Sequence, residues 1–106
     1  MLKKYDLMFV SKVDTEELYD ELIEKYKKLI LNGGGEILKA DKWGRKNLAT
    51  IVKGLKEGNF TWFGFISEGE VVRNIDKTLK KDKEILKFMI ISDSSWGKEQ
   101  QNGKIL

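Results

Sequence analysis

Short apolar runs and longer amphipathic stretches follow one another along this chain. The runs at residues 5–10, 60–66 and 85–91 are rich in strand-forming residues and predict three β-strands. Residues 36–52 predict a longer extended segment with spaced apolar positions, and Gly44 in its middle indicates a bulge or a bend. The pattern therefore predicts four strands.

Two further stretches have apolar side chains three and four residues apart, which is typical of amphipathic helices. The first starts near Asp14, which can cap it with Glu17 in a capping-box position, and ends at the glycines 33–35. The second starts after Ser67, with Glu70 at the same offset. The predicted apolar faces are Leu18, Leu22, Ile23, Tyr26, Leu29 and Ile30 in the first helix, and Val72, Ile75, Thr78 and Leu79 in the second.

The predicted order is strand, helix, strand, strand, helix, strand, with a turn at residues 54–59 between the two central strands. Right-handed crossovers place both helices on one side of the sheet. We therefore expect an α+β protein with the ferredoxin-like βαββαβ plait, a four-stranded antiparallel sheet with two helices on one face. Residues 1–93 would form this domain, and the polar, aperiodic residues 94–106 would form a flexible C-terminal tail.

Composition narrows the classes of function. The chain has 106 residues and neither cysteine nor histidine, which excludes disulfides and thiolate metal sites and removes the commonest general base. We therefore expect no enzyme and no metal site. We also expect a soluble cytoplasmic protein, because the N-terminus lacks the apolar core of a signal peptide and no stretch approaches the ~20 apolar residues of a membrane span. The formal net charge of +3 is compatible with nucleic acid.

Large apolar side chains occur on both faces of the predicted strands. Helices cover only one face of such a sheet, so the other face should be polar, yet several apolar side chains remain there whichever face is covered. Three explanations are open. The face contacts a partner protein, it stacks on RNA bases although the signature strand of RNA-recognition motifs is absent, or Trp96, Ile105 and Leu106 fold over it. The candidates for a partner-protein surface are Met8, Phe60, Trp62 and Met89.

Basic residues gather at strand ends and in the long second strand. They are either solvated edge charges, which deter aggregation, or contacts to phosphate. The lysine-rich run 77–87 also contains acids and is interpreted as a solvated helix end, and no glycine cluster leads into the Lys-Ser/Thr of a phosphate-binding loop. The cations associated with strands are Lys3, Lys4, Lys42, Arg45, Lys46 and Lys53.

Four segments carry a resemblance to a known family. They are the basic start Lys3-Lys4-Tyr5, the motif Trp-Gly-Arg-Lys-Asn-Leu-Ala at residues 43–49, the aromatic strand 60–65, and the acidic turn and apolar strand at 82–91. Together, over about residues 3–92, they resemble bacterial small-subunit ribosomal protein six. One departure is plain, since the family's Tyr-Pro after the motif is replaced here by Thr50-Ile51.

The resemblance implies a ferredoxin-like structural protein of the 30S subunit. It implies binding to the central domain of 16S ribosomal RNA together with small-subunit ribosomal protein eighteen, with no catalytic activity, no cofactor, no small-molecule substrate and no membrane. It places the protein at the ribosome in the cytoplasm. The RNA-contact candidates that match family positions are Lys3, Tyr5, Arg45, Lys46 and Lys87.

Two other functions stay open at the level of sequence. One is a stand-alone ferredoxin-like module for binding or dimerisation, which would use the face of the sheet that the helices leave open. The other is an enzyme built on carboxylates or lysine, but the sequence contains no converging set of titratable residues that favours it.

Overall fold

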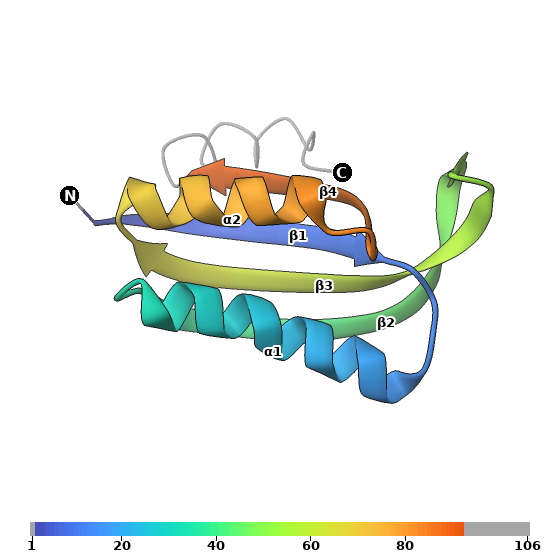
Figure 1. Cartoon of the computed structure of the whole chain (residues 1–106), viewed down its shortest axis with the longest axis horizontal. Helices are drawn as coiled ribbons and strands as arrows, with labels where there is room; N and C mark the ends of the chain where they lie inside the picture. The colour runs from blue at the N-terminus through green and yellow to red at the C-terminus, as the bar shows by residue number, and fades with distance from the viewer. Residues whose placement is uncertain (1, 93–106) are drawn as a thin grey trace.

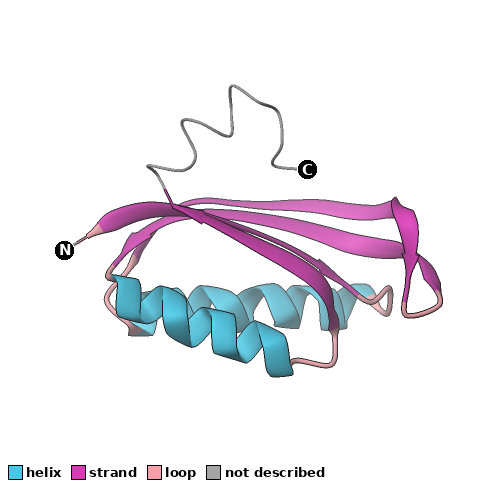
Figure 2. Cartoon of the chain, turned by 90° about the horizontal axis from the view of Figure 1, so that it is seen from above, coloured by secondary structure: helices cyan, strands magenta, loops and turns pink. Residues whose placement is uncertain are grey.

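The computed structural model describes residues 2–92. It confirms the predicted α+β fold, with four antiparallel strands in the order β2-β3-β1-β4 and two helices on one face (Figures 1 and 2). The predicted tail, residues 94–106, lies outside the described residues. The elements are β1 (Lys3–Ser11), α1 (Glu16–Asn32), β2 (Glu36–Val52), β3 (Leu55–Ser67), α2 (Gly69–Lys81) and β4 (Ile85–Ser92).

The strand register divides the sheet into two faces. Leu7 in β1 lies opposite Phe63 in β3 and Ile90 in β4, so these side chains point to the same side, toward the helices. The neighbouring residue Met8 lies opposite Trp62 and points the other way. We call the face without helices the open face. The alternation predicted from sequence for β1 and β3 is therefore confirmed.

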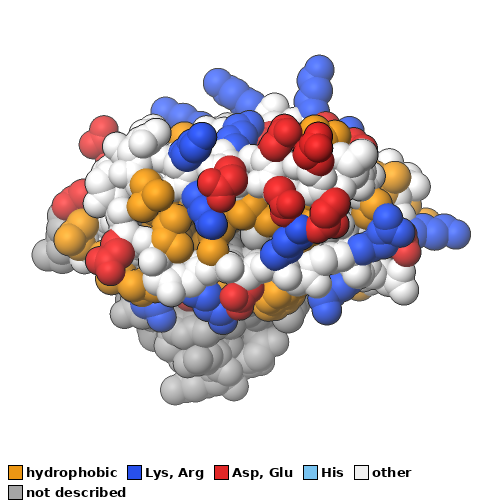
Figure 3. Space-filling model, turned by 90° about the horizontal axis from the view of Figure 1, so that it is seen from below, with side chains coloured by type: hydrophobic (Ala, Val, Ile, Leu, Met, Phe, Trp, Pro, Cys, Tyr) orange, Lys and Arg blue, Asp and Glu red, His pale blue; other side chains and the backbone are white. Residues whose placement is uncertain are grey.

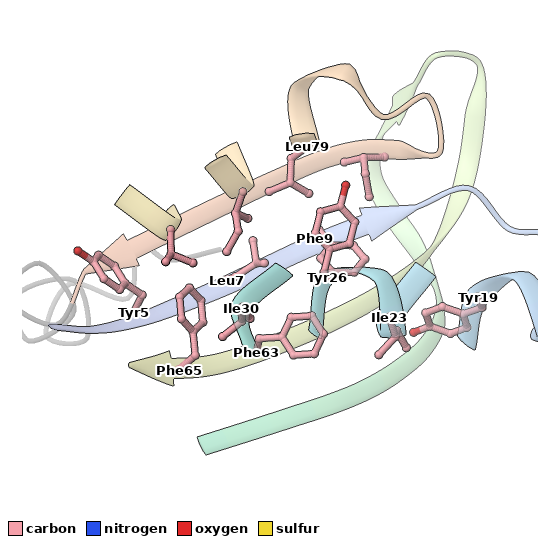
Figure 4. Close-up of a cluster of buried hydrophobic side chains, with 13 residues drawn as sticks. Tyr5, Leu7, Phe9, Tyr19, Ile23, Tyr26, Ile30, Phe63, Phe65 and Leu79 are labelled. Atoms are coloured by element: carbon pink, nitrogen blue, oxygen red, sulfur yellow. The ribbon is translucent and has the colours of Figure 1, made fainter. Parts of the chain in front are cut away.

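The core fills the space between the helices and the sheet (Figure 4). Phe9 lies at its centre, where its ring contacts those of Tyr26 and Phe63 with centroids 5.2 and 6.0 Å apart. Such tilted aromatic pairs contribute about 0.5–1.5 kcal/mol beyond the area that they bury. The buried cluster consists of Tyr5, Leu7, Phe9, Tyr19, Ile23, Tyr26, Ile30, Phe63, Phe65, Val71, Ile75, Leu79 and Ile85.

Both predicted helix caps are wrong by one residue. Thr15 caps α1, with its hydroxyl accepting the Leu18 N–H, while the Asp14 carboxylate accepts the Thr15 N–H. Glu68 occupies the N-cap position of α2 without a capping side-chain hydrogen bond, because Ser67 still belongs to β3. Asp and Thr are both good caps, so sequence preference alone does not choose between neighbours.

The buried face of α1 also differs from the prediction. Leu18 is 46% exposed, whereas Tyr19 is buried and joins the core. Periodicity favours the apolar residue, but tyrosine buries its ring when its hydroxyl finds a hydrogen-bond partner. Those partners lie in β2 and β3 and are described below.

The β2–β3 hairpin extends beyond the other strands at one end of the sheet (Figures 1 and 2). Its turn consists of Lys53 and Gly54 alone, between the paired residues Val52 and Leu55, so the predicted turn at 54–59 is wrong over 55–59, which are strand. Both turn residues have positive φ, 51° and 79°, which matches the right-handed twist of the flanking strands.

Candidate functional site

The four predicted partner-surface residues lie next to one another on the open face. Met8 is opposite Trp62 on one side and Met89 on the other, and Phe60 follows in the next row, opposite Val10. Met8, Phe60 and Met89 are partly buried, and Trp62 is only 8% exposed. The register thus joins residues from three strands into one apolar patch.

A second tryptophan covers part of Trp62. The rings of Trp43 and Trp62 stack with centroids 5.4 Å apart and an angle of 25° between their planes. The Trp62 indole N–H donates to Oδ1 of the buried Asp6 at 3.1 Å, and the Lys39 ammonium lies 5.9 Å from the Trp62 ring. Trp43 itself is 39% exposed and so supplies the accessible aromatic surface of this group.

Gly64 makes the arrangement around Asp6 possible. A side chain at Gly64 would place its Cβ 3.3 Å from Asp6 Oδ1 and 3.5 Å from the Lys39 Cβ. The former contact is tighter than ordinary packing, so the carboxylate and its neighbours would have to move. Glycine at this position therefore has a packing reason in addition to interrupting the aromatic strand.

A β-bulge decides which side chains of β2 reach the open face. Lys42 pairs with Thr61 and Gly44 with Phe60, so Trp43 is an extra residue in β2. Gly44 has φ of +87°, a conformation that glycine adopts without strain, and the predicted bulge is confirmed. Because of the extra residue, Trp43 and Lys46 share the open face.

The adjacent cations Arg45 and Lys46 therefore point to opposite sides. The Lys46 ammonium lies 5.9 Å from the Trp43 ring, on the open face. Arg45 pairs in register with Asn59 and its guanidinium lies 3.9 Å from the Glu57 carboxylate. Lys87 is on the open face opposite Val10, in the same row as Phe60.

Lys42 lies on the helix side and is held by acids. Its ammonium donates to the carboxylates of Glu16 and Asp20 in α1, the latter at 2.6 Å. The hydrogen bonds that Lys42 donates to Asp20, and then to Glu16, raise the pKa of Lys42 to about 12. Its charge is already matched within the chain, which corrects the expectation that it belongs to a set of cations available for phosphate.

Lys3 and Tyr5 lie at the other end of the sheet from these cations. Val10 follows Lys3 by seven positions in β1, a span of about 23 Å at the usual rise of a strand. The Tyr5 ring belongs to the core and stacks on Phe65 with centroids 5.7 Å apart. The five RNA-contact candidates thus fall into two separate groups, and Lys46 and Lys87 are the pair that shares the open face.

Charges of both signs lie together away from the open face as well. Figure 3 shows acidic and basic side chains side by side along the edge formed by α1 and β2. Among the residues of the open face that are paired in the strand register, four are lysines and three are acids, a net charge of +1, so position matters more than total charge. These are Lys4, Lys39, Lys46 and Lys87, with Asp6, Glu36 and Asp41.

A second polar group away from the open face joins α1 to the turn before β4. Asp82 accepts hydrogen bonds from the Tyr26 hydroxyl at 2.8 Å, the Lys25 ammonium at 2.9 Å and the Glu84 N–H at 3.0 Å. Burial opposes ionisation of Asp82, but these donors hold its pKa below the ordinary value. For Tyr26, burial and the nearby Asp82 carboxylate both raise the pKa of the hydroxyl. A cavity of about 330 Å³ beside this group is lined by Leu18, Leu22 and Lys25, among others.

Within residues 2–92 no set of three or more acidic side chains is placed to hold a metal ion. In the same residues no helix is long and apolar enough to cross a membrane.

Sequence reasoning missed three residues of the open face: Trp43, Asp6 and Lys39. Trp43 and its contact with Lys46 depend on the bulge, and Gly44 was the signal that could have found it. Asp6 could have been recognised as a charged residue inside an apolar strand, a position that requires a partner.

Comparison with known proteins decides the family. A family model described as Ribosomal protein S6 matches residues 4–92. The chain belongs to the ribosomal protein S6 family. Small ribosomal subunit protein bS6 of Thermoanaerobacter pseudethanolicus is 32% identical over 91 residues, covering 85% of this chain and 96% of the relative. The bS6 protein of Carboxydothermus hydrogenoformans is 28% identical over 95 residues, covering 88% and 98%.

The fold of the S6 family is also found by structure. The crystal structure of 30S ribosomal protein S6 from Thermotoga maritima matches with a TM-score of 0.83 at 23% identity, over 98% of this chain and 99% of that one. The resemblance noted from sequence is confirmed. As a member of this family, the protein is a component of the small ribosomal subunit, located at the ribosome in the cytoplasm.

Proposed function

We propose that this member of the S6 family binds the central domain of 16S ribosomal RNA together with small-subunit ribosomal protein eighteen, without catalysis, cofactor or small-molecule substrate. The patch of Met8, Phe60 and Met89 around Trp62 carries the proposal. Partly exposed apolar side chains gathered on one face are typical of a protein interface, and Lys46 and Lys87 at its border are suited to phosphate.

The arrangement supports a division of roles within the open face. Met8 and Met89 are flexible apolar side chains directly opposite each other, and such residues adapt to a partner's shape. Lys87 lies at the end of the row of Phe60 and Val10, and Lys46 lies in the next row, opposite Gly58, so phosphates would contact the end of the face nearest the β2 bulge. Protein eighteen would then cover the apolar patch and contribute the rest of the RNA surface.

Arg45 and Lys46 should not contribute equally, although they are neighbours. Lys46 is on the open face, whereas Arg45 points to the helix side and faces Glu57. We therefore expect Lys46→Ala to weaken RNA binding more than Arg45→Ala. Lys3 and Tyr5, about 23 Å and about 17 Å along β1 from the row of Phe60 and Val10, would need a separate part of the RNA.

The test is a titration of a central-domain RNA fragment with the full chain, alone and with protein eighteen, at several salt concentrations. We expect weak binding alone, much tighter binding with the partner, and an affinity that falls linearly with the logarithm of salt. An affinity that ignores either the partner or the salt would contradict the proposal. A concentration-dependent dimer in sedimentation, without RNA affinity, would instead support a stand-alone dimerisation module.

A further inference from the structure

The Tyr19 hydroxyl lies between two strands at the point where the β2 bulge forms. It accepts the N–H of Gly44 in β2 at 3.1 Å and donates to the carbonyl of Phe60 in β3. Gly44 and Phe60 are register partners at the bulge, so one side chain of α1 bridges the two strands where the pairing shifts. Figure 4 shows Tyr19 at the end of the core that adjoins this part of the sheet.

Other residues of the same helix face reinforce this contact. Glu16 and Asp20, three residues before and one after Tyr19, hold the Lys42 ammonium, which lies 4.8 Å from the centre of the Tyr19 ring. Lys42 and Gly44 flank Trp43 in sequence. The first turns of α1 therefore hold β2 on both sides of the extra residue.

The consequence appears on the opposite side of the sheet. Trp43 stacks on Trp62 there, and the Lys46 ammonium lies over the Trp43 ring. A shift of one residue in a strand moves each side chain to the other face. The direction of Trp43 and Lys46 thus depends on the bulge staying where Tyr19 bridges it.

We infer that Tyr19 is a positioning residue for the RNA- and partner-binding face, although it lies on the helix side and touches neither ligand; the inference rests on the proposed function. The hydroxyl fixes the bulge at Gly44, and the bulge presents Trp43 and Lys46. Burial alone does not require the hydroxyl, because phenylalanine would fill the same space. Its two hydrogen bonds to backbone are the feature that a purely apolar core position would lack.

The variant Tyr19→Phe removes the hydroxyl and keeps the ring. Tyr26→Phe is a matched control, since Tyr26 lies on the same helix and donates its hydroxyl to Asp82 rather than to the sheet. The first measurement is the exciton couplet of the stacked tryptophans in circular dichroism, in a Trp96→Phe background that leaves only Trp43 and Trp62. Trp43→Phe in that background defines the signal without the pair.

We expect Tyr19→Phe to reduce the couplet by at least about half and to speed hydrogen exchange of the Gly44 amide about tenfold, while Tyr26→Phe changes neither. A merely stabilising role would affect both variants alike. An unchanged couplet and unchanged Gly44 exchange in Tyr19→Phe would overturn the inference.

The second measurement is affinity for the RNA fragment with protein eighteen. We expect Tyr19→Phe to weaken binding about fivefold to tenfold, and to add little further loss when Trp43 and Lys46 are already both replaced by alanine, because Tyr19 acts through these two side chains. The inference would be overturned if the loss of affinity from Tyr19→Phe added in full to that of the other substitutions. It would also be overturned if Tyr19→Phe lost the couplet but bound normally. If the unmodified protein did not bind the RNA fragment with protein eighteen, the proposed function would be overturned instead. The couplet and the exchange of the Gly44 amide would then decide whether Tyr19 positions Trp43.

Discussion

Leu7 and Met8 are neighbours in β1, yet they lie in two different environments. Leu7 is fully buried between Phe63 of β3 and Ile90 of β4, beneath the helices. Met8 is partly exposed between Trp62 and Met89, on the face that no helix covers. Every strand of this sheet thus supplies alternate residues to two surfaces with different requirements.

The difference teaches which features stabilise the fold and which serve the proposed binding. The helix side is filled by aromatic and aliphatic groups that satisfy one another within the chain. The open face combines apolar side chains with lysines and the buried carboxylate of Asp6, a mixture that packs less completely on its own. Substitutions on the two faces should therefore be felt in different measurements.

The largest expected effect is on the helix side. Phe63→Ala should lower the free energy of unfolding by about 3–5 kcal/mol, because Phe63 is fully buried and the change leaves a cavity. The matched control is Phe60→Ala in the same strand, where a partly exposed ring should cost about 1–2 kcal/mol. Urea denaturation measures both, and equal losses would contradict the division between the faces.

A polar group on the helix side should come next. Asp82→Asn should lower the free energy of unfolding at pH 7 by about 2 kcal/mol, because the hydrogen bonds of Tyr26 and the Glu84 N–H to a charged acceptor are weakened. The exposed Lys25 should contribute little of this. An unchanged free energy of unfolding in Asp82→Asn would mean that the hydrogen bonds to this carboxylate are dispensable to the fold.

The pH dependence of the free energy of unfolding gives a second test of Asp82. The donors keep the pKa of Asp82 below its ordinary value of 3.8, despite its burial. Its contribution to stability is therefore complete above about pH 4 and is lost as the pH falls through the lower, folded-state pKa. Asp82→Asn should flatten this acid limb; a variant with the same acid limb as the unmodified protein would show that another carboxylate causes it.

Substitutions of the open-face lysines should change the affinity for RNA rather than the stability of the fold. Replacing Lys46 and Lys87 with alanine should reduce the salt slope of RNA affinity by about 1.5, since each phosphate contact contributes about 0.7–0.9. Unfolding should hardly change. The control, Lys77→Ala with Lys80→Ala, removes the same charge from α2, and an equal reduction in slope would show that only net charge matters.

The smallest expected effect is a gain in stability. The Thr61 hydroxyl is fully buried on the helix side, and it has no hydrogen-bond partner among the described residues. Thr61→Val should raise the free energy of unfolding by about 1 kcal/mol, because an unpaired buried hydroxyl is costly. Thr61→Ser keeps the hydroxyl and should be destabilising; a loss of stability in the valine variant would indicate a partner for the hydroxyl.

Much of the fold could be predicted from the sequence because local patterns and packing agree. The period of two in β1 and β3 correctly assigned Tyr5, Leu7 and Phe9 to one face and Met8 to the other. Glycines ended α1 where expected. The family resemblance, which depended on motifs along nearly the whole chain, was confirmed as well.

The candidate site was less predictable, for a physical reason. Two residues of β2, Leu38 and Trp43, are extra in the pairing with β3, and each reverses the side of every later residue, so the face of Lys46 could not be assigned without locating both. Tyr19 was overlooked in favour of Leu18 because its burial depends on hydrogen bonds to distant strands. Lys42 resembled a free cation until its acidic partners in α1 were visible.

The measurement that tests the central claim most directly compares Leu7→Val with Met8→Ala, adjacent residues on opposite faces. Unfolding and affinity for the RNA fragment with protein eighteen are measured for both. We predict that Leu7→Val loses about 1 kcal/mol of stability and binds normally, whereas Met8→Ala loses a similar amount or less and binds at least fivefold more weakly. Normal binding by Met8→Ala, or an equal loss of affinity in Leu7→Val, would contradict the assignment of the open face to binding.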